Sequence, residues 1–208
     1  MKVLGVVPAR GGSKRIPRKN TKLLCGKPLL CYTIRACQES ERLTDWVVST
    51  EDPEIRGLAN SYGAKVLHRP PELAEDKTTS GEVMVHAMEA YADERYDAFV
   101  CLHPTSPLRT GKHIDEALTL GPNTVSVELL AAKSHRHVNA GGAWFSGAFV
   151  LNAAIYVSTP QSLYNTGSHV PTDPKFYVMD KMSSIDINEP IDFKIAELYM
   201  RELQRENS

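Results

Sequence analysis

The stretch that decides the fold is "KVLGVVPARGGSKRIPRKN", residues 2–20. It begins with an apolar run of about the length of one buried strand. It continues with two glycines, a serine and five cations between residues 8 and 20. In open α/β sheets, ligands bind beyond the carboxyl ends of the strands. The stretch therefore predicts an α/β fold with an anion site at the end of its first strand.

The rest of the chain alternates apolar runs with amphipathic stretches, which predicts a mostly parallel central sheet flanked by helices in three α/β/α layers. We expect one domain over residues 1–208, with an excursion or hairpin at about 131–151. Short strands are expected at "KFYVM" (175–179) and "SIDI" (184–187). Further strands are expected at 3–9, 46–50, 98–102 and 124–129, with another short one at 65–68, and the last helix is expected from 190 to about 204.

Charge is distributed unevenly along the chain. The formal net charge is −1, which argues against a dedicated nucleic-acid-binding protein. Nine of the 24 cations precede the first acidic residue, Glu39, so the N-terminal segment is a local basic site. No run is long enough to span a membrane, and the four cysteines form no zinc or C-x-x-C pattern. We therefore expect a cytoplasmic protein with reduced thiols and no nucleic-acid or membrane partner.

Residues 10–19 have the composition of a phosphate-binding loop. Glycine lets backbone N–H groups approach phosphate oxygens, which accounts for Gly11 and Gly12. Arg10 offers a planar fork for two oxygens, and Lys14 and Lys19 supply mobile charges. The G-x-x-x-x-G-K-[ST] and G-x-G-x-x-G loops are both absent. The alternative to a phosphate loop is a flexible, solvated basic loop.

Seven motifs in order carry a family resemblance that covers nearly the whole chain. They are "PARGGSKRIPRKN", "LCGKPL", "VVSTEDPEI", "YGAKVLHRPPELAED", "HPTSPLRT", "NAAIYVS" and "SSIDINEPIDFKIAE". This series resembles the CMP-acylneuraminate (CMP-sialic acid) synthetase family. The resemblance implies a Rossmann-like homodimer that transfers CMP from CTP to the anomeric hydroxyl of an acidic nine-carbon sugar. It also implies release of pyrophosphate and a requirement for Mg²⁺, with Mn²⁺ as a substitute.

The resemblance also implies roles on the nucleotide side. Arg10 and Lys19 would stabilise the triphosphate and the departing pyrophosphate as catalytic residues. The implied nucleotide-binding residues are Gly11, Gly12, Ser13, Lys14, Asn20, Arg69 and Ser80. Two of these have plain alternatives: Asn20 as a turn residue, and Arg69 as a surface cation before two prolines.

On the sugar side, the resemblance implies a second set of contacts. These residues are His103, Thr105, Ser106, Arg109, Lys133, Asn152 and Tyr156. The family usually has glutamine where this chain has His103, so His103 is either a general base, a neutral sugar contact or a strand-end histidine. Arg109 either contacts the substrate or supports the start of a helix.

The predicted metal site is Asp186 with Asn188, because Mg²⁺ prefers hard oxygen ligands. The family pattern is Asp-Ile-Asp, in which alternation along an extended segment puts both carboxylates on one face. Asn188 is a metal ligand, a water holder or the N-cap of the last helix. Asp192 reads as a first-turn acid favoured by the helix dipole.

The sequence departs from the family pattern between residues 139 and 151, where it is shorter and contains no cation. The sugar is therefore left open among sialic, legionaminic and pseudaminic types. The aromatics Trp144, Phe145 and Phe149 are assigned to core or interface packing. The alternatives are a nucleotidyltransferase for another nucleotide or sugar, and a nucleotide-binding protein without turnover.

Overall fold

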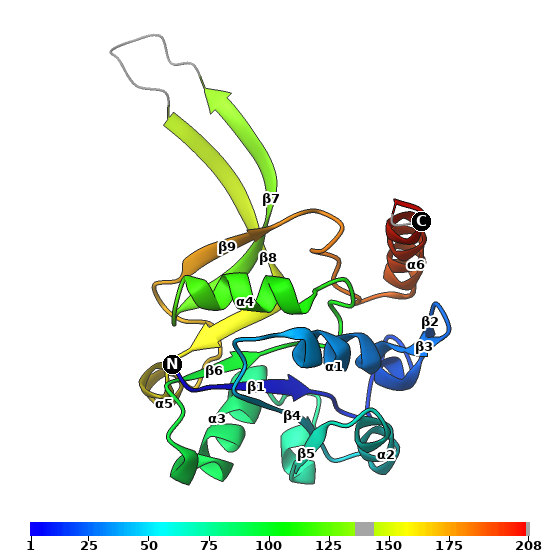
Figure 1. Ribbon diagram of the computed structural model, residues 1–208, viewed down its shortest axis with the longest axis vertical. Helices are drawn as coiled ribbons and strands as arrows, with labels where there is room; N and C mark the ends of the chain where they lie inside the picture. Colours follow the sequence, from blue (N-terminus) through cyan, green and yellow to red (C-terminus); the bar gives the residue numbers. More distant parts are fainter. Residues whose placement is uncertain (136–143, 207–208) are drawn as a thin grey trace.

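The computed structural model describes residues 1–135 and 144–206, with side chains described outside 130–148 and up to 205. A seven-stranded sheet in the order β5-β4-β1-β6-β8-β7-β9 forms its centre (Figure 1). Of these strands, β8 alone runs against its neighbours, which confirms the predicted mostly parallel sheet. The strands are β1 Val3–Pro8, β4 Asp45–Thr50, β5 Lys65–His68, β6 Ala98–Cys101, β7 Thr124–His135, β8 Trp144–Ser158 and β9 Lys175–Met179, with a separate pair β2 Leu23–Leu24 and β3 Lys27–Pro28.

Helices cover both faces of the sheet. They are α1 Leu29–Glu39, α2 Pro53–Ser61, α3 Ser80–Ala90, α4 Gly111–Thr119, α5 Pro160–Thr166 and α6 Pro190–Glu206, with short 3-10 turns at Lys19–Thr21, Pro71–Ala74 and Ala92–Glu94. Helices α1 and α4 lie on one side and α3 and α5 on the other (Figure 1). Strand alternation explains this arrangement, because Val3 and Val7 of β1 face the first layer while Leu4 and Val6 face the second.

A third hydrophobic cluster joins the C-terminal helix to the basic segment after β1. Ile16 and Leu24 pack with Ile187 and with Phe193 and other apolar residues of α6. The segment 184–187, predicted as a strand, is irregular instead, and its one sheet-like bond runs from the Ile187 N–H to the Thr105 carbonyl at 2.8 Å. Packing on this cluster therefore holds the predicted metal residues beside the phosphate loop without strand pairing.

Strands β7 and β8 pair antiparallel in a long hairpin that projects from the body (Figure 1), and the excursion or hairpin expected at about 131–151 falls on these two strands. The side chains of Lys133, Trp144 and Phe145 lie outside the described residues. Phe149 is exposed and stacks on Phe176 of β9, with ring centroids 5.8 Å apart.

All four cysteines are free thiols. Within the described part of the chain, no helix is long and apolar enough to cross a bilayer.

Candidate active site

Three neighbouring cavities lie at the carboxyl ends of β1 and β6, and Arg10 lines all of them. The basic cavity has a volume of about 340 Å³, the inner cavity about 240 Å³ and the central cavity about 170 Å³. The basic cavity is lined by Arg10, Ser13, Lys14, Arg15, Lys19, Asp76 and Asn188. The inner cavity includes Arg69, Ser80 and His103, and the central cavity Gly12, Asn20 and Thr105. The sequence-predicted nucleotide residues are therefore brought together.

In the basic cavity, cations of the loop face an acidic residue. Arg10 Nη1 lies 3.2 Å and Lys14 Nζ 2.5 Å from the carboxylate of Asp76. Arg10 Nη1 also donates to the carbonyl of Glu75 at 3.0 Å. Asp76 is half exposed and sits in the loop before α3, so a more highly charged anion could replace it on both cations. No local sequence pattern predicts this contact, because Asp76 is far from Arg10 along the chain.

Lys19 and Asn20 fix the far side of the loop. Lys19 Nζ donates to the Ile187 carbonyl at 2.9 Å, and burial lowers the pKa of Lys19 below its ordinary value. Asn20 is buried, and its Nδ2 donates to the Arg10 carbonyl at 2.9 Å. The amide of Asn20 therefore supports the backbone that carries Arg10.

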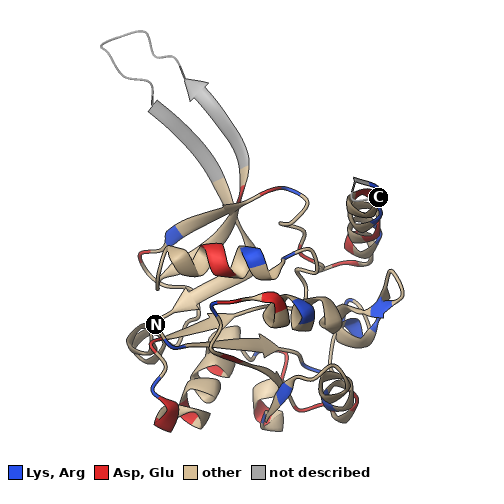
Figure 2. Cartoon of the chain, viewed as in Figure 1, with Lys and Arg blue, Asp and Glu red and all other residues tan. Residues whose placement is uncertain are grey.

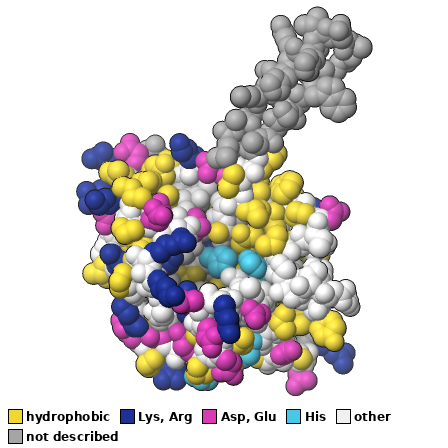
Figure 3. Space-filling model, turned by 180° about the vertical axis from the view of Figure 1, so that it is seen from behind, with side chains coloured by type: hydrophobic (Ala, Val, Ile, Leu, Met, Phe, Trp, Pro, Cys, Tyr) yellow, Lys and Arg dark blue, Asp and Glu magenta, His cyan; other side chains and the backbone are white. Residues whose placement is uncertain are grey.

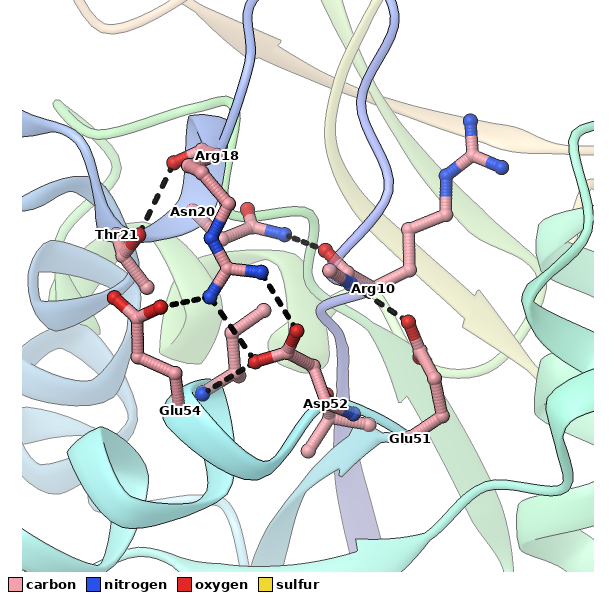
Figure 4. A network of polar contacts seen from close by, with 10 residues as sticks. Arg10, Arg18, Asn20, Thr21, Glu51, Asp52 and Glu54 are labelled. Carbon is pink, nitrogen blue, oxygen red and sulfur yellow. Dashed lines mark hydrogen bonds and ion pairs between the residues drawn. The ribbon is translucent and has the colours of Figure 1, made fainter.

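The two adjacent glycines have different reasons to be glycine. The Gly11 N–H donates to Glu51 Oε1 at 2.7 Å, and a Cβ at this position would collide with the Asp52 carboxylate (Figure 4). A Cβ at Gly12 would meet nothing within 4 Å. The approach of phosphate to the two N–H groups stays a prediction, and in this structure Glu51 accepts from the Gly11 N–H. Gly11 is required by packing, whereas Gly12 faces open space.

Acidic residues at the start of α2 form ion pairs with the basic segment after β1. Arg18, with a left-handed φ of 54°, donates to both carboxylate oxygens of Asp52 at 2.7 and 3.3 Å and also to Glu54 (Figure 4). Asp52 Oδ1 also accepts from the Ile55 N–H at 2.9 Å as the N-cap of α2. The hydrogen bonds from Arg18 lower the pKa of Asp52. Figure 2 shows Lys or Arg positions next to Asp or Glu positions near α2.

Arg69 lies inside the inner cavity wall rather than on the surface. Its side chain is buried, and it donates to the Ser49 hydroxyl at 3.2 Å and the Ser49 carbonyl at 2.6 Å. Burial lowers the pKa of Arg69 to about 10, so it stays charged at neutral pH. The surface-cation alternative is wrong.

His103 has both ring nitrogens engaged by the protein. Nδ1 lies 3.0 Å from the Ala153 carbonyl and Nε2 lies 3.0 Å from the Ser80 hydroxyl. Burial lowers the pKa of His103 to about 4. A ring so weakly basic and without a free nitrogen is a poor general base, so the structure disfavours that alternative. A sugar contact through a ring nitrogen would have to replace one of these two bonds.

His169, which lies between α5 and β9, was not singled out from the sequence. Its ring packs edge to face against His103 and Tyr156, with centroids 5.6 and 4.7 Å apart. Burial lowers the pKa of His169 to about 4, with a further contribution from His103. Seen from behind, histidine side chains lie in a hollow with Lys and Arg along one side and hydrophobic residues on the other (Figure 3).

Several predicted sugar residues are turned toward the protein instead. Arg109 is fully buried and donates to the carbonyls of His103 and Ala154 at 3.1 and 2.8 Å. Asn152 donates to the Ser184 hydroxyl at 2.9 Å. These contacts favour the structural alternative for Arg109.

The remaining sugar-side residues differ in their access to the site. Ser106 is buried, and its hydroxyl makes no hydrogen bond among the described residues. Tyr156 is buried beneath His169, whereas Thr105 lines the central cavity. Thr105 is thus the one of these three with direct access to that cavity.

The predicted metal residues lie together beside the basic cavity. Asn188 Nδ2 donates to Asp186 Oδ2 at 2.7 Å, while Asp186 Oδ1 is buried and has no hydrogen-bond partner among the residues that the structure describes. Asn188 is not the N-cap, because Asp192 Oδ2 accepts from the N–H groups of Asn188 and Glu189 at 2.8 and 2.7 Å. Within the described residues, no three acidic, histidine or cysteine side chains converge. The free oxygen of Asp186 fits a cation whose other ligands are phosphate and water.

Residues 4–139 match the family model described as cytidylyltransferase. The chain belongs to the cytidylyltransferase family. It is 33% identical over 216 residues to an N-acylneuraminate cytidylyltransferase of Escherichia coli, covering 94% of this chain but 51% of that protein. It is also 33% identical over 233 residues to the CMP-N,N'-diacetyllegionaminic acid synthase of Legionella pneumophila, covering 99% of each. The chain thus spans about half of the first relative and nearly all of the second.

Solved structures confirm the fold predicted for this cytidylyltransferase. A CMP:2-keto-3-deoxy-manno-octonic acid synthetase complexed with CTP matches with a TM-score of 0.74 at 14% identity, covering 97% of this chain and 99% of that one. A 4-diphosphocytidyl-2C-methyl-D-erythritol synthase from Anaerococcus prevotii matches with a TM-score of 0.67 at 12% identity, covering 96% of both. These likenesses concern the fold alone.

Proposed function

We propose that this cytidylyltransferase transfers CMP from CTP to the anomeric hydroxyl of an acidic nine-carbon sugar and releases pyrophosphate. One observation carries the proposal: Arg10 joins a cavity lined by four cations to an inner cavity of a size for a nucleoside. The names of the relatives, which include sialic, legionaminic and pseudaminic acid enzymes, support the sugar class. The free thiols agree with a reaction in the cytoplasm.

The triphosphate lies in the basic cavity in this proposal. Arg10 and Lys14 leave Asp76 and pair with phosphate oxygens, because a phosphate carries more charge than the carboxylate it replaces. Gly12 offers its N–H from open space, and Ser13 adds its hydroxyl. The base and ribose then enter the inner cavity.

The reaction is an in-line attack in which the anomeric hydroxyl oxygen of the sugar forms a bond to the α-phosphorus, the bond from that phosphorus to the bridging oxygen of pyrophosphate breaks, and the hydroxyl proton passes to solvent water. Positioning and charge stabilisation carry most of such a transfer. Arg10 and Lys19 stabilise the charge that develops on the departing pyrophosphate. Asp186 and Asn188 would hold Mg²⁺, or Mn²⁺ in its place, which when bound neutralises phosphate charge. His103 stays neutral and takes no proton.

The acceptor sugar lies on the side of β6 and the projecting hairpin. Thr105 and His103 line the central cavity, and the rings of Tyr156 and His169 pack against the ring of His103. Lys133 is the candidate for the sugar carboxylate, and it lies on β7 opposite Ser146 of β8. The sugar hydroxyl therefore approaches from the hairpin side while pyrophosphate leaves toward the loop.

We also propose that a second copy of the chain covers an apolar face at the base of the hairpin. Five apolar side chains on one face of β7, β8 and β9 are 42–51% exposed: Leu129, Phe149, Leu151, Phe176 and Val178. Light scattering should give a dimer for the parent chain and a monomer for Phe149→Asp with Phe176→Asp. The exposed Leu23→Asp is the control. A parent chain that is monomeric at all concentrations would contradict the dimer.

Pyrophosphate release with N-acetylneuraminic, legionaminic and pseudaminic acids tests the function. We expect release from CTP and Mg²⁺ with one of these sugars, at least tenfold above UTP, ATP and GTP. Release from UTP alone would establish another nucleotidyltransferase. Tight CTP binding without release across the panel would indicate a nucleotide-binding protein, for which Asn188 in place of a second carboxylate is the motivating observation.

A further inference from the structure

Strand β8 carries a bulge where it pairs with β7. Residues 152–155 all face the single residue Ser126 of β7, so the regular pairing of the two strands is interrupted there. Within the bulge, Ala153 has a left-handed φ of 58°, and its carbonyl lies 3.0 Å from Nδ1 of His103 and orients that ring. Bulges redirect backbone and side-chain groups, and they occur often next to active sites. The side chains of this bulge are therefore candidates for orienting the site.

Asn152, the first residue of the bulge, has both ends of its amide hydrogen-bonded inside the protein. Its Oδ1 accepts from the Ser126 hydroxyl at 2.5 Å and from the Ala154 N–H at 3.3 Å. Its Nδ2 donates to the Ser184 hydroxyl at 2.9 Å. The side chains of Asn152, Ser126 and Ser184 are all buried. Asn152 thus joins the two hairpin strands to the segment that follows β9.

The segment 184–188 carries the proposed metal residue Asp186 and has no regular secondary structure. Near its C-terminal end, the Ile187 N–H donates to the Thr105 carbonyl at 2.8 Å. The Ile187 carbonyl accepts from Lys19 Nζ at 2.9 Å. Because the segment pairs with no strand, the place of Asp186 depends on such separate hydrogen bonds at either end.

The N-terminal end of this segment is held at Ser184. Its N–H donates to the Asp180 carbonyl at 3.0 Å, which closes a local turn. Its hydroxyl accepts from Asn152 of β8 at 2.9 Å and lies 3.5 Å from the Met179 carbonyl of β9. The bond from Asn152 is therefore the shorter of the two that join Ser184 to the sheet, and Asp186 follows two residues later.

We propose that Asn152 is a positioning residue for the divalent cation, because through Ser184 it fixes the backbone that carries Asp186. This inference rests on the proposed function, in which Asp186 holds Mg²⁺ beside the triphosphate. Asp186 Oδ1 is buried and has no hydrogen-bond partner among the described residues, so its direction depends on the backbone. Removal of a group that orients a metal ligand typically lowers metal affinity by about 10–100-fold. Asn152 thus acts on the metal without contact to it.

Calorimetry with CTP, without an acceptor sugar, tests this role. Each protein is titrated in excess Mg²⁺ and again in EDTA, and the ratio of the two CTP affinities, which we call the Mg²⁺ ratio, reports the contribution of the metal. The parent chain and Asp186→Ala set the upper and lower limits of this ratio. Asn152→Ala should lower the Mg²⁺ ratio by roughly tenfold, the lower end of the range for such supporting groups. Its CTP affinity in EDTA should equal that of the parent.

Ser184→Ala removes the same hydrogen bond from the other side and should lower the Mg²⁺ ratio to a similar extent, so it decides the matter when Asn152→Ala does not fold. Ser158→Ala is the matched control, because it removes a buried serine hydroxyl of β8 that donates to the His169 carbonyl at 2.9 Å instead. It should keep the parent ratio. In the Asp186→Ala background, Asn152→Ala should leave the ratio unchanged, since the carboxylate it positions is absent. Thermal melting verifies that each variant is folded.

Two results would overturn the inference. One is a folded Asn152→Ala or Ser184→Ala that keeps the parent Mg²⁺ ratio. The other is an equal loss of CTP affinity in Mg²⁺ and in EDTA, because Asn152 would then support the cavities rather than the metal residue. A parent chain whose Mg²⁺ ratio equals that of Asp186→Ala would refute the metal site of the proposed function itself, and the role of Asn152 with it.

Discussion

Arg10, in the loop after β1, and Arg109, in the loop between β6 and α4, have opposite kinds of hydrogen-bond partner. Arg10 is partly exposed and bonded to Asp76 and to loop carbonyls, groups that a phosphate can replace. Arg109 is fully buried and bonded to the carbonyls of His103 and Ala154, which belong to the sheet framework. On the β1 side, which we call the exchangeable side, arginine therefore binds partners that a ligand can displace. On the β8 side, the fixed side, arginine binds partners that belong to the fold. What distinguishes them is the mobility and charge of their partners.

Replacement of Arg10 should impair catalysis through the exchangeable side. Arg10→Ala is expected to lower turnover with CTP by about 10²–10³-fold, the typical loss for one charge-stabilising group. Its melting temperature should stay close to that of the parent, because its partners are exposed. Steady-state pyrophosphate assays and thermal melting measure the two effects, with the exposed Arg56→Ala as control. Near-normal turnover would remove Arg10 from the mechanism.

Replacement of Arg109 should destabilise the fold through the fixed side. Arg109→Ala leaves two buried carbonyls and the Thr33 hydroxyl without their donor. We expect a loss of about 3 kcal/mol in the free energy of unfolding. Arg109→Lys should not restore it, since one ammonium cannot span the same partners. Urea unfolding gives the values, and an unchanged midpoint for Arg109→Ala would show that the carbonyls find other donors.

Acid should weaken the fixed side through its histidines. His103 and His169 have pKa values lowered to about 4 by burial, against an ordinary 6.5. The unfolded chain therefore binds more protons, and stability is lost as the pH falls from 6.5 toward 4. Between pH 7 and pH 5 each ring should cost about 2 kcal/mol. Urea unfolding at both pH values checks this loss, and His169→Phe should reduce it. An equal loss in that variant would exclude His169 as a cause.

The smallest expected effect is a change in CTP affinity when Asp76, the carboxylate on the exchangeable side, is replaced. Asp76→Asn removes the carboxylate that competes with phosphate for Arg10 and Lys14. CTP should then bind roughly twofold to fivefold more tightly, in line with the modest strength of exposed ion pairs. Calorimetry at low and high salt measures the change, with the exposed Asp173→Asn as a control of equal charge. Weaker CTP binding in Asp76→Asn would mean that Asp76 helps to hold the ligand.

Much of the fold was readable from the sequence, because strand and helix periodicities are local properties. The strands expected at 46–50, 65–68 and 98–102 lie at Asp45–Thr50, Lys65–His68 and Ala98–Cys101. The strand expected at 184–187 failed, since Ile187 is buried by packing against α6 rather than by sheet pairing. Apolar alternation alone does not distinguish these two kinds of burial.

The sequence predicted which residues lie at the site better than it predicted what each of them contacts. Arg69 and Ser80 reach the inner cavity as expected, but the partners of Gly11, Arg18 and His103 come from segments 23–50 residues away. No local pattern shows that Glu51 takes the Gly11 N–H or that a bulge in β8 orients His103. Such roles depend on tertiary contacts.

A crystal structure with a non-hydrolysable CTP analogue and Mg²⁺ tests the central claim most directly. We expect Arg10 to leave Asp76 and lie within hydrogen-bond distance of a phosphate oxygen, while Arg109 keeps its bonds to His103 and Ala154. An analogue bound elsewhere, or bound with the Arg10 and Lys14 pairs to Asp76 intact, would contradict the division into an exchangeable and a fixed side.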